Sequence, residues 1–181
     1  MAQLVNFSAD TPALVRQLAA CLQQRQLLLA CAESCTGGLI AAACTDLAGS
    51  SQWFERGFVS YSNAAKTEWL GVDAALIAQH GAVSEAVVRA MAQGALAHSH
   101  AQVAVAVTGV AGPAGGSADK PVGTVWFAWA TPTALISQRQ HFDGDRAAVR
   151  QATVRHALAG LLDRLNCGKH DTDQRLPPAP A

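Results

Sequence analysis

The hydrophobic positions of the chain alternate between helical spacing and short continuous apolar runs. Leu14, Leu18 and Leu22 recur about every four residues, which is the period of a helix that buries one face. Pro12 suits the first turn of a helix because its missing N–H would have no partner there. We therefore expect a first helix that runs to about Gln24 and packs on the core.

Residues 27–32 form a short continuous apolar run, and the mostly apolar segments 57–61 and 102–107 are two further predicted strands. Runs of this kind are typical of strands that are buried on both faces, as in parallel sheets. Helices are predicted between them at about 37–46, after a cap at Ser62 or Asn63, at 73–79, and after a cap at Ser84.

The second half of the chain has a different pattern. The segment Thr108–Ser117 is too rich in glycine for a helix or a strand and is predicted to be a long loop. Gly123–Ala130 and Ile136–Phe142 are predicted strands joined by a hairpin, and a last helix is expected from about Asp145 to Leu165. Strands and helices that alternate indicate an α/β domain with helices on both faces of a mostly parallel sheet.

Length and charge limit the classes of protein. The chain has 181 residues, with 13 Lys and Arg against 13 Asp and Glu, so it fits one domain and lacks the excess positive charge of a nucleic-acid binder. No apolar run reaches the roughly 18 residues of a membrane span, and the N-terminus lacks a signal-peptide pattern. We expect a cytoplasmic protein with one domain over 1–166 and a disordered tail over 167–181.

The cysteines and histidines do not predict a metal site. The five cysteines are an odd number without a Cys-x-x-Cys pair, so we interpret them as reduced, small core residues. No cluster of Cys and His has the spacing of zinc ligands. We therefore expect neither a metal nor a cofactor.

Ser34 lies where the first predicted strand meets the next helix, in the sequence Glu-Ser-Cys-Thr-Gly-Gly. Ligands of open α/β sheets bind beyond the carboxyl ends of the strands, and a helix start offers free N–H groups to an oxyanion or a phosphate. Ser34 is thus a candidate nucleophile. On spacing alone, Ser34 or Thr36 can equally be a simple helix cap, with the glycines forming the turn.

A serine nucleophile needs a base, and Lys66 is the best-placed candidate. Only three lysines occur, and Lys66 is the one on a predicted helix, five positions after the only tyrosine, Tyr61. A solvated helix lysine remains the alternative. Arg146 and Arg150, one turn apart in the last helix, are either a solvated face or a clamp for a phosphate.

Several segments together resemble the CinA C-terminal domain family over about residues 11–165. They are Ala32–Gly38, Gly57–Asn63 with Lys66, His80–Ser84, Thr108–Pro113, Lys120–Val125 and Gly144–Arg146. Characterised members of this family are nicotinamide-nucleotide amidohydrolases. The resemblance implies a three-layer α/β/α sandwich with a mixed five-stranded sheet, and a homodimer or larger homo-oligomer.

The resemblance also implies a reaction, the hydrolysis of the carboxamide of nicotinamide mononucleotide (NMN) to nicotinate mononucleotide and ammonia without a metal. By position, the catalytic residues are Ser34 as the nucleophile, Lys66 as the base, and Tyr61 beside them. The substrate-binding positions are expected to be Thr108, Arg146, Cys35, Thr36, Gly37, Gly38, Gly109 and Gly112. A non-catalytic module that binds a pyridine nucleotide or another phosphorylated ligand is the alternative function.

Overall fold

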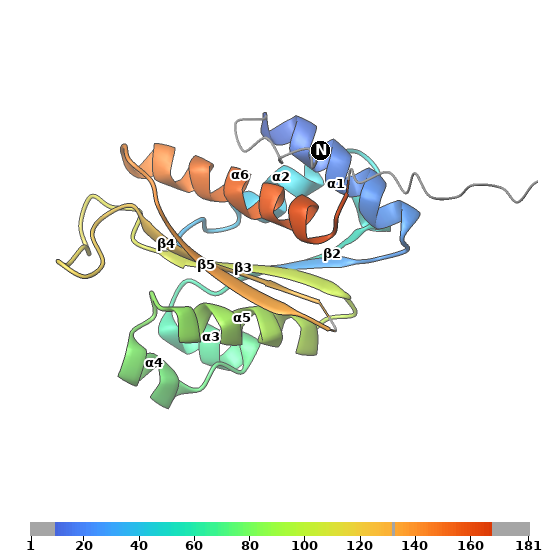
Figure 1. Cartoon of the computed structure of the whole chain (residues 1–181). Helices are drawn as coiled ribbons and strands as arrows, with labels where there is room; N and C mark the ends of the chain where they lie inside the picture. Colours follow the sequence, from blue (N-terminus) through green and yellow to red (C-terminus); the bar gives the residue numbers. More distant parts are fainter. Residues whose placement is uncertain (1–9, 132, 168–181) are drawn as a thin grey trace, which may run out of the picture.

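The computed structural model of the protein describes residues 10–131 and 133–167, which form three layers (Figure 1). A five-stranded sheet lies in the middle, with α1, α2 and α6 over one face and α3, α4 and α5 over the other. The α/β/α sandwich with a mixed sheet is confirmed. The predicted tail falls, from residue 168 on, outside the described residues.

The sheet has the strand order β2-β1-β3-β4-β5. β1 runs parallel to β2 and to β3, whereas β4 is antiparallel to both β3 and β5. The strands are β1 (Leu29–Glu33), β2 (Phe54–Val59), β3 (Val103–Gly109), β4 (Thr124–Ala130) and β5 (Leu135–His141). The carboxyl ends of the three parallel strands therefore meet at one edge of the sheet.

The helices begin and end close to the predicted positions. They are α1 (Thr11–Gln24), α2 (Leu39–Thr45), α3 (Asn63–Leu70), α4 (Ala74–His80), α5 (Glu85–Ala97) and α6 (Arg146–Arg164), with a short 3-10 turn at Ser50–Gln52. Ser62 caps α3 by accepting the N–H of Ala65, and Ser84 caps α5 by accepting the N–H of Val87. Both caps were expected, because a serine oxygen can satisfy a free N–H of the first turn.

β2 begins three residues before the predicted strand, at Phe54 instead of Gly57, and ends at Val59 instead of Tyr61. Among the described residues it is an edge strand, paired with β1 alone. Polar residues are tolerated at such an edge, and Glu55 and Arg56 pair with each other there. These two charged residues come directly before the segment 57–61, so the prediction began the strand after them.

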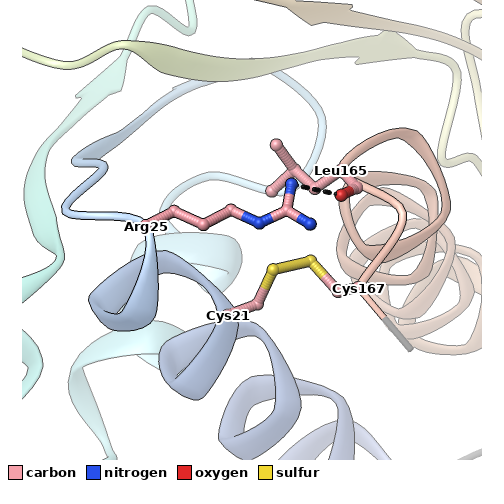
Figure 2. Close-up of a disulfide and its surroundings, with 4 residues drawn as sticks. All are labelled: Cys21, Arg25, Leu165 and Cys167. Atoms are coloured by element: carbon pink, nitrogen blue, oxygen red, sulfur yellow. Dashed lines mark hydrogen bonds between the residues drawn. A yellow bond between two sulfur atoms is a disulfide. The ribbon is translucent and has the colours of Figure 1, made fainter. Parts of the chain in front are cut away.

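The prediction that all cysteines are reduced is wrong for two of them. Cys21 of α1 forms a disulfide with Cys167, which follows α6, although 146 positions separate them (Figure 2). The helices α1 and α6 lie side by side. The Cα atoms of Cys21 and Cys167 are 5.8 Å apart, within the range that a disulfide requires. Arg25 also donates to the carbonyl of Leu165. Cys31, Cys35 and Cys44 are free and buried, as predicted.

Candidate active site

The site forms where the parallel strands end. Ser34 follows β1, and its N–H donates to the carbonyl of Val107 in β3 at 3.1 Å. Ser60 follows β2, and its N–H donates to the carbonyl of Glu33 at 2.9 Å. These hydrogen bonds hold the ends of three neighbouring strands in register, so residues from distant parts of the sequence lie together at one edge.

Lys66 and Ser34 are in direct contact. The Lys66 side chain is 1% exposed, and its Nζ lies 3.1 Å from the Ser34 Oγ. The same Nζ donates to the carbonyl of Ser60 at 2.7 Å and lies 3.4 Å from that of Tyr61. Ser62 starts α3 immediately afterwards, which places Lys66 in the first turn of this helix and turns its side chain toward β1.

Burial lowers the pKa of the Lys66 ammonium below its ordinary value, because the charged form loses its hydration. Among the described residues, no carboxylate lies within salt-bridge distance of Lys66 to oppose this effect. A neutral amine has two N–H donors and one lone pair. If the donors serve the carbonyls of Ser60 and Tyr61, the lone pair faces the Ser34 hydroxyl.

The turn after Ser34 depends on two glycines. Gly37 and Gly38 have φ values of +58° and +98°, in the left-handed region that other residues rarely adopt. The N–H of Gly37 donates to the carbonyl of Ser34, and the N–H of Gly38 donates to the Glu33 carboxylate. Neither N–H is therefore available to a substrate.

The N–H groups of Cys35 and Thr36 are not used in the hydrogen bonds of this turn. Among the hydrogen bonds of the described residues, neither N–H has an oxygen acceptor, and both lie close to the Cys35 sulfur.

Burial raises the pKa of the Cys35 thiol to about 12. Cys35 is therefore protonated at neutral pH, and Ser34, not its neighbour, is the candidate nucleophile.

Arg146 connects the loop after β3 with the segment after β2. Its guanidinium donates to the carbonyl of Gly112 at 2.9 Å and to the Tyr61 hydroxyl at 3.2 Å. One turn later, Arg150 donates to the carbonyl of Thr36 at 2.7 Å. None of these acceptors is a carboxylate, and the ion pairs of the described residues do not include either arginine. In the described part of the chain, neither guanidinium is therefore paired with an acidic side chain.

Tyr61 is less involved in the Ser34 contact than its position in the sequence implies. Its ring is 60% exposed, and only its backbone carbonyl approaches Lys66. Its phenol oxygen instead accepts from Arg146. The side chain therefore lies at the rim of the site.

Thr108 and Gly109, at the end of β3, have local contacts of their own. The Thr108 hydroxyl is buried and donates to the carbonyl of Ala82 at 2.9 Å. A Cβ at Gly109 would lie 2.7 Å from the carbonyl oxygen of Thr124, so this glycine permits close approach of β4. At Gly112, the feature that reaches the site is the carbonyl held by Arg146.

Sequence reasoning missed two groups that the structure places here. Glu33 is fully buried and accepts hydrogen bonds from the start of α2, and the carbonyl of Ser60 receives Lys66. A backbone carbonyl leaves no signal in a sequence. An acidic residue that ends an otherwise apolar strand does leave one, because a buried carboxylate requires donors nearby.

The fold and the site define a three-layer α/β protein with a candidate Ser/Lys hydrolase site. The chain belongs to the CinA C-terminal domain family, whose model matches residues 11–165. Within the described residues, no group of three or more His, Cys, Asp or Glu side chains is arranged to hold a metal ion. None of the helices in that part of the chain is long and apolar enough to cross a membrane.

Similar proteins carry informative names. A protein from Pseudomonas putida named nicotinamide-nucleotide amidohydrolase PncC is 62% identical over 131 residues, which are 72% of this chain and 82% of that protein. A protein of the same name from Escherichia coli is 54% identical over 149 residues, 82% of this chain and 90% of that protein.

Solved structures agree with the fold. The crystal structure of a CinA superfamily protein from Klebsiella pneumoniae superposes with a TM-score of 0.84 at 42% identity and covers 87% of this chain and 99% of that chain. A competence/damage inducible protein from Agrobacterium tumefaciens gives the same TM-score at 44% identity, over 92% of this chain and 99% of its own.

Proposed function

We propose that the protein hydrolyses the carboxamide of NMN to nicotinate mononucleotide and ammonia by a Ser/Lys amidase mechanism. The names of the relatives support the substrate and the reaction. The observation that carries the mechanism is the contact of 3.1 Å between the Lys66 Nζ and the Ser34 Oγ, with the lysine buried.

Lys66 is the general base in this mechanism. Its neutral amine accepts the proton of the Ser34 hydroxyl, and Ser34 Oγ attacks the carboxamide carbon, which forms a C–O bond and moves one electron pair onto the carbonyl oxygen. The carbonyls of Ser60 and Tyr61 accept from the ammonium that results, and so stabilise the charge that develops on Lys66.

The N–H groups of Cys35 and Thr36 are the proposed oxyanion donors, because the next two N–H groups of the turn already have acceptors. Collapse of the tetrahedral intermediate breaks the C–N bond. The leaving nitrogen takes the proton from Lys66 and departs as ammonia. Water, deprotonated by Lys66, then attacks the ester carbon, the bond to Ser34 Oγ breaks, and Lys66 returns the proton to Ser34 Oγ as nicotinate mononucleotide leaves.

Arg146 and Arg150 are the proposed contacts for the 5′-phosphate. A guanidinium pairs well with a phosphate, and these two lack an acidic partner within the described residues. Binding a phosphate would replace the neutral acceptors that Arg146 now has, the Gly112 carbonyl and the Tyr61 hydroxyl. Tyr61, at the rim, is placed to border the bound nucleotide.

Release of ammonia from NMN tests the proposal, with nicotinamide and NAD as comparison substrates. We expect release from NMN without added metal, its loss in Ser34→Ala, and its near loss in Lys66→Ala. Ser51→Ala is a matched control, because Ser51 is an exposed serine of the 3-10 turn at Ser50–Gln52, outside the site. Full release by Ser34→Ala would eliminate the proposed nucleophile.

A module that only binds nucleotides is the alternative, and the same protein distinguishes the two. Tight binding of NMN in a calorimetric titration, with no ammonia over hours, would favour it. The Ser34 and Lys66 contact argues for the enzyme, because phosphate binding alone does not require a desolvated amine against a hydroxyl.

The family resemblance also leads us to propose a cytoplasmic homo-oligomer. Val59, at the end of the edge strand β2, and Trp69 of α3 are large hydrophobic side chains that are 40% and 51% exposed. Size-exclusion chromatography with light scattering tests the proposal, and a mass equal to that of one chain would contradict it.

A further inference from the structure

Glu33 is the one acidic side chain that the described part of the chain buries completely, and it lies next to the candidate nucleophile. Moving a carboxylate out of water is costly unless donors replace its hydration. Here Oε2 accepts the N–H groups of Gly38 at 3.0 Å and Ile40 at 3.1 Å, while Oε1 accepts that of Ala41 at 2.8 Å. Three backbone N–H groups and the Cys31 thiol, which lies 3.4 Å from Oε1, thus converge on one side chain.

The donors belong to the start of α2. The first N–H groups of a helix have no partner within the helix, and its N-terminus carries a partial positive charge. The N-cap residue Gly38 has no side chain that could act as a cap. The Glu33 carboxylate takes this role from the preceding strand and fills the anion site that the helix start would otherwise offer to a ligand.

The backbone of Glu33 is also linked by hydrogen bonds to the Ser34 and Lys66 pair. Its side chain points toward α2, on the same face of the sheet as Cys31. Successive residues of a strand point to opposite faces, so Ser34 points toward α3, which carries Lys66. The carbonyl of Glu33 accepts the N–H of Ser60, whose own carbonyl receives the Lys66 amine at 2.7 Å.

We propose that Glu33 is a positioning residue for the hydrolysis: its carboxylate fixes the turn from Ser34 to Gly38, so that the Ser34 hydroxyl faces Lys66 and the N–H groups of Cys35 and Thr36 face the developing oxyanion. This inference rests on the proposed function. Glu33 neither touches the substrate nor transfers a proton. It keeps the N–H groups of Gly38, Ile40 and Ala41 occupied and thereby keeps the turn in one conformation.

Glu33→Gln tests this role with minimal change in shape. An amide has only one acceptor oxygen, so its NH₂ group must face either the Ala41 N–H or the pair from Gly38 and Ile40. We expect the turn to shift and kcat for ammonia release from NMN to fall by about ten- to a hundredfold, since small displacements of reacting groups have effects of this size. KM should change less than kcat, because Arg146 contacts Gly112 and Tyr61 and not this turn.

A second readout does not depend on the substrate. A fluorophosphonate reacts with an activated serine, and mass spectrometry measures how fast the Ser34 peptide is labelled. The labelling rate of Glu33→Gln should fall by about tenfold or more relative to the original protein. If the original protein released no ammonia from NMN, the proposed function would fail, yet the labelling rates would still test the role of Glu33.

Asp73→Ala is the matched control. Asp73 caps α4 by accepting the N–H of Ala75 at 2.8 Å, and α4 contributes no residue to the site. This variant weakens a helix cap, as Glu33→Gln does, so it measures the effect of lower stability alone. Its melting temperature should fall while kcat and Ser34 labelling stay unchanged.

The outcomes separate positioning from stability. A Glu33→Gln protein with a lower melting temperature but unchanged kcat and unchanged labelling would overturn the proposal, and so would an effect confined to KM. If Glu33→Gln does not fold, Glu33→Asp decides, because it keeps the charge but is one methylene shorter and cannot reach all three donors. A lower kcat at unchanged KM supports positioning, and an unchanged kcat refutes it.

Discussion

Replacing Lys66 with methionine separates the chemistry of its amine from the packing of its side chain. Methionine keeps an unbranched apolar stem in the buried position, but it has no N–H donor and no basic lone pair. Ser34 then loses the acceptor that lies 3.1 Å from its hydroxyl. A positioned general base contributes about 10²- to 10⁴-fold to a rate, so kcat should fall by a factor in this range.

The pH dependence of kcat/KM in the unmodified protein is a second test of Lys66 as the base. A lysine with an ordinary pKa of about 10.4 is neutral in only about one molecule in 2,500 at pH 7. Burial lowers the pKa of Lys66, and each unit of lowering increases the neutral fraction about tenfold. The rate kcat/KM should therefore rise with pH and level off, with a midpoint below 10.4.

Steady-state ammonia release from pH 6 to 10.5 is the assay, with the fold of Lys66→Met checked by circular dichroism. A folded Lys66→Met protein that retains full kcat would refute the assignment of Lys66 as the base. So would a midpoint at the ordinary lysine pKa, since the buried amine would then gain nothing from its position.

Three further predictions concern stability and binding. Because folding lowers the pKa of Lys66, the unfolded chain binds more protons than the folded one between this lowered pKa and about pH 10.4. In that interval the free energy of unfolding should rise with pH, by at most about 1.4 kcal/mol per pH unit from this group, and denaturant titrations at several pH values should show a smaller rise in Lys66→Met. Arg146→Ala should raise KM for NMN about tenfold or more, with Arg146→Lys intermediate, whereas an unchanged KM would remove Arg146 from the phosphate site. Cys167→Ser should lower the free energy of unfolding by at most about 5 kcal/mol, from the chain entropy of a loop of this length, without changing ammonia release; a loss of activity would show that the disulfide also shapes the site.

The parts of the fold that local residues specify could be predicted from the sequence. Ser62 and Ser84 cap helices where expected, and the apolar run before Ser34 is a buried strand. The order of the strands depends on which surfaces pack together, which no local pattern records. The Cys21–Cys167 disulfide is of this kind, because it requires α1 and α6 to lie side by side.

The site was predictable to a similar degree. The scarcity of lysine and the family resemblance both singled out Lys66, and the structure brings it to Ser34. The hydrogen-bond partners were not predictable. Gly38 was expected among the substrate-binding positions, and its N–H is already accepted by Glu33, since a helix start attracts the nearest carboxylate as readily as it attracts a substrate.

The proposed mechanism requires that Ser34 form a covalent intermediate with the nucleotide. Rapid acid quenching of the protein during turnover of NMN, followed by mass spectrometry of its peptides, detects such an intermediate. We expect the Ser34 peptide to carry the acyl group of nicotinate mononucleotide in an ester and the Ser34→Ala protein to carry none. Ammonia release with the acyl group on another residue, or at an undiminished rate in Ser34→Ala, would contradict the mechanism.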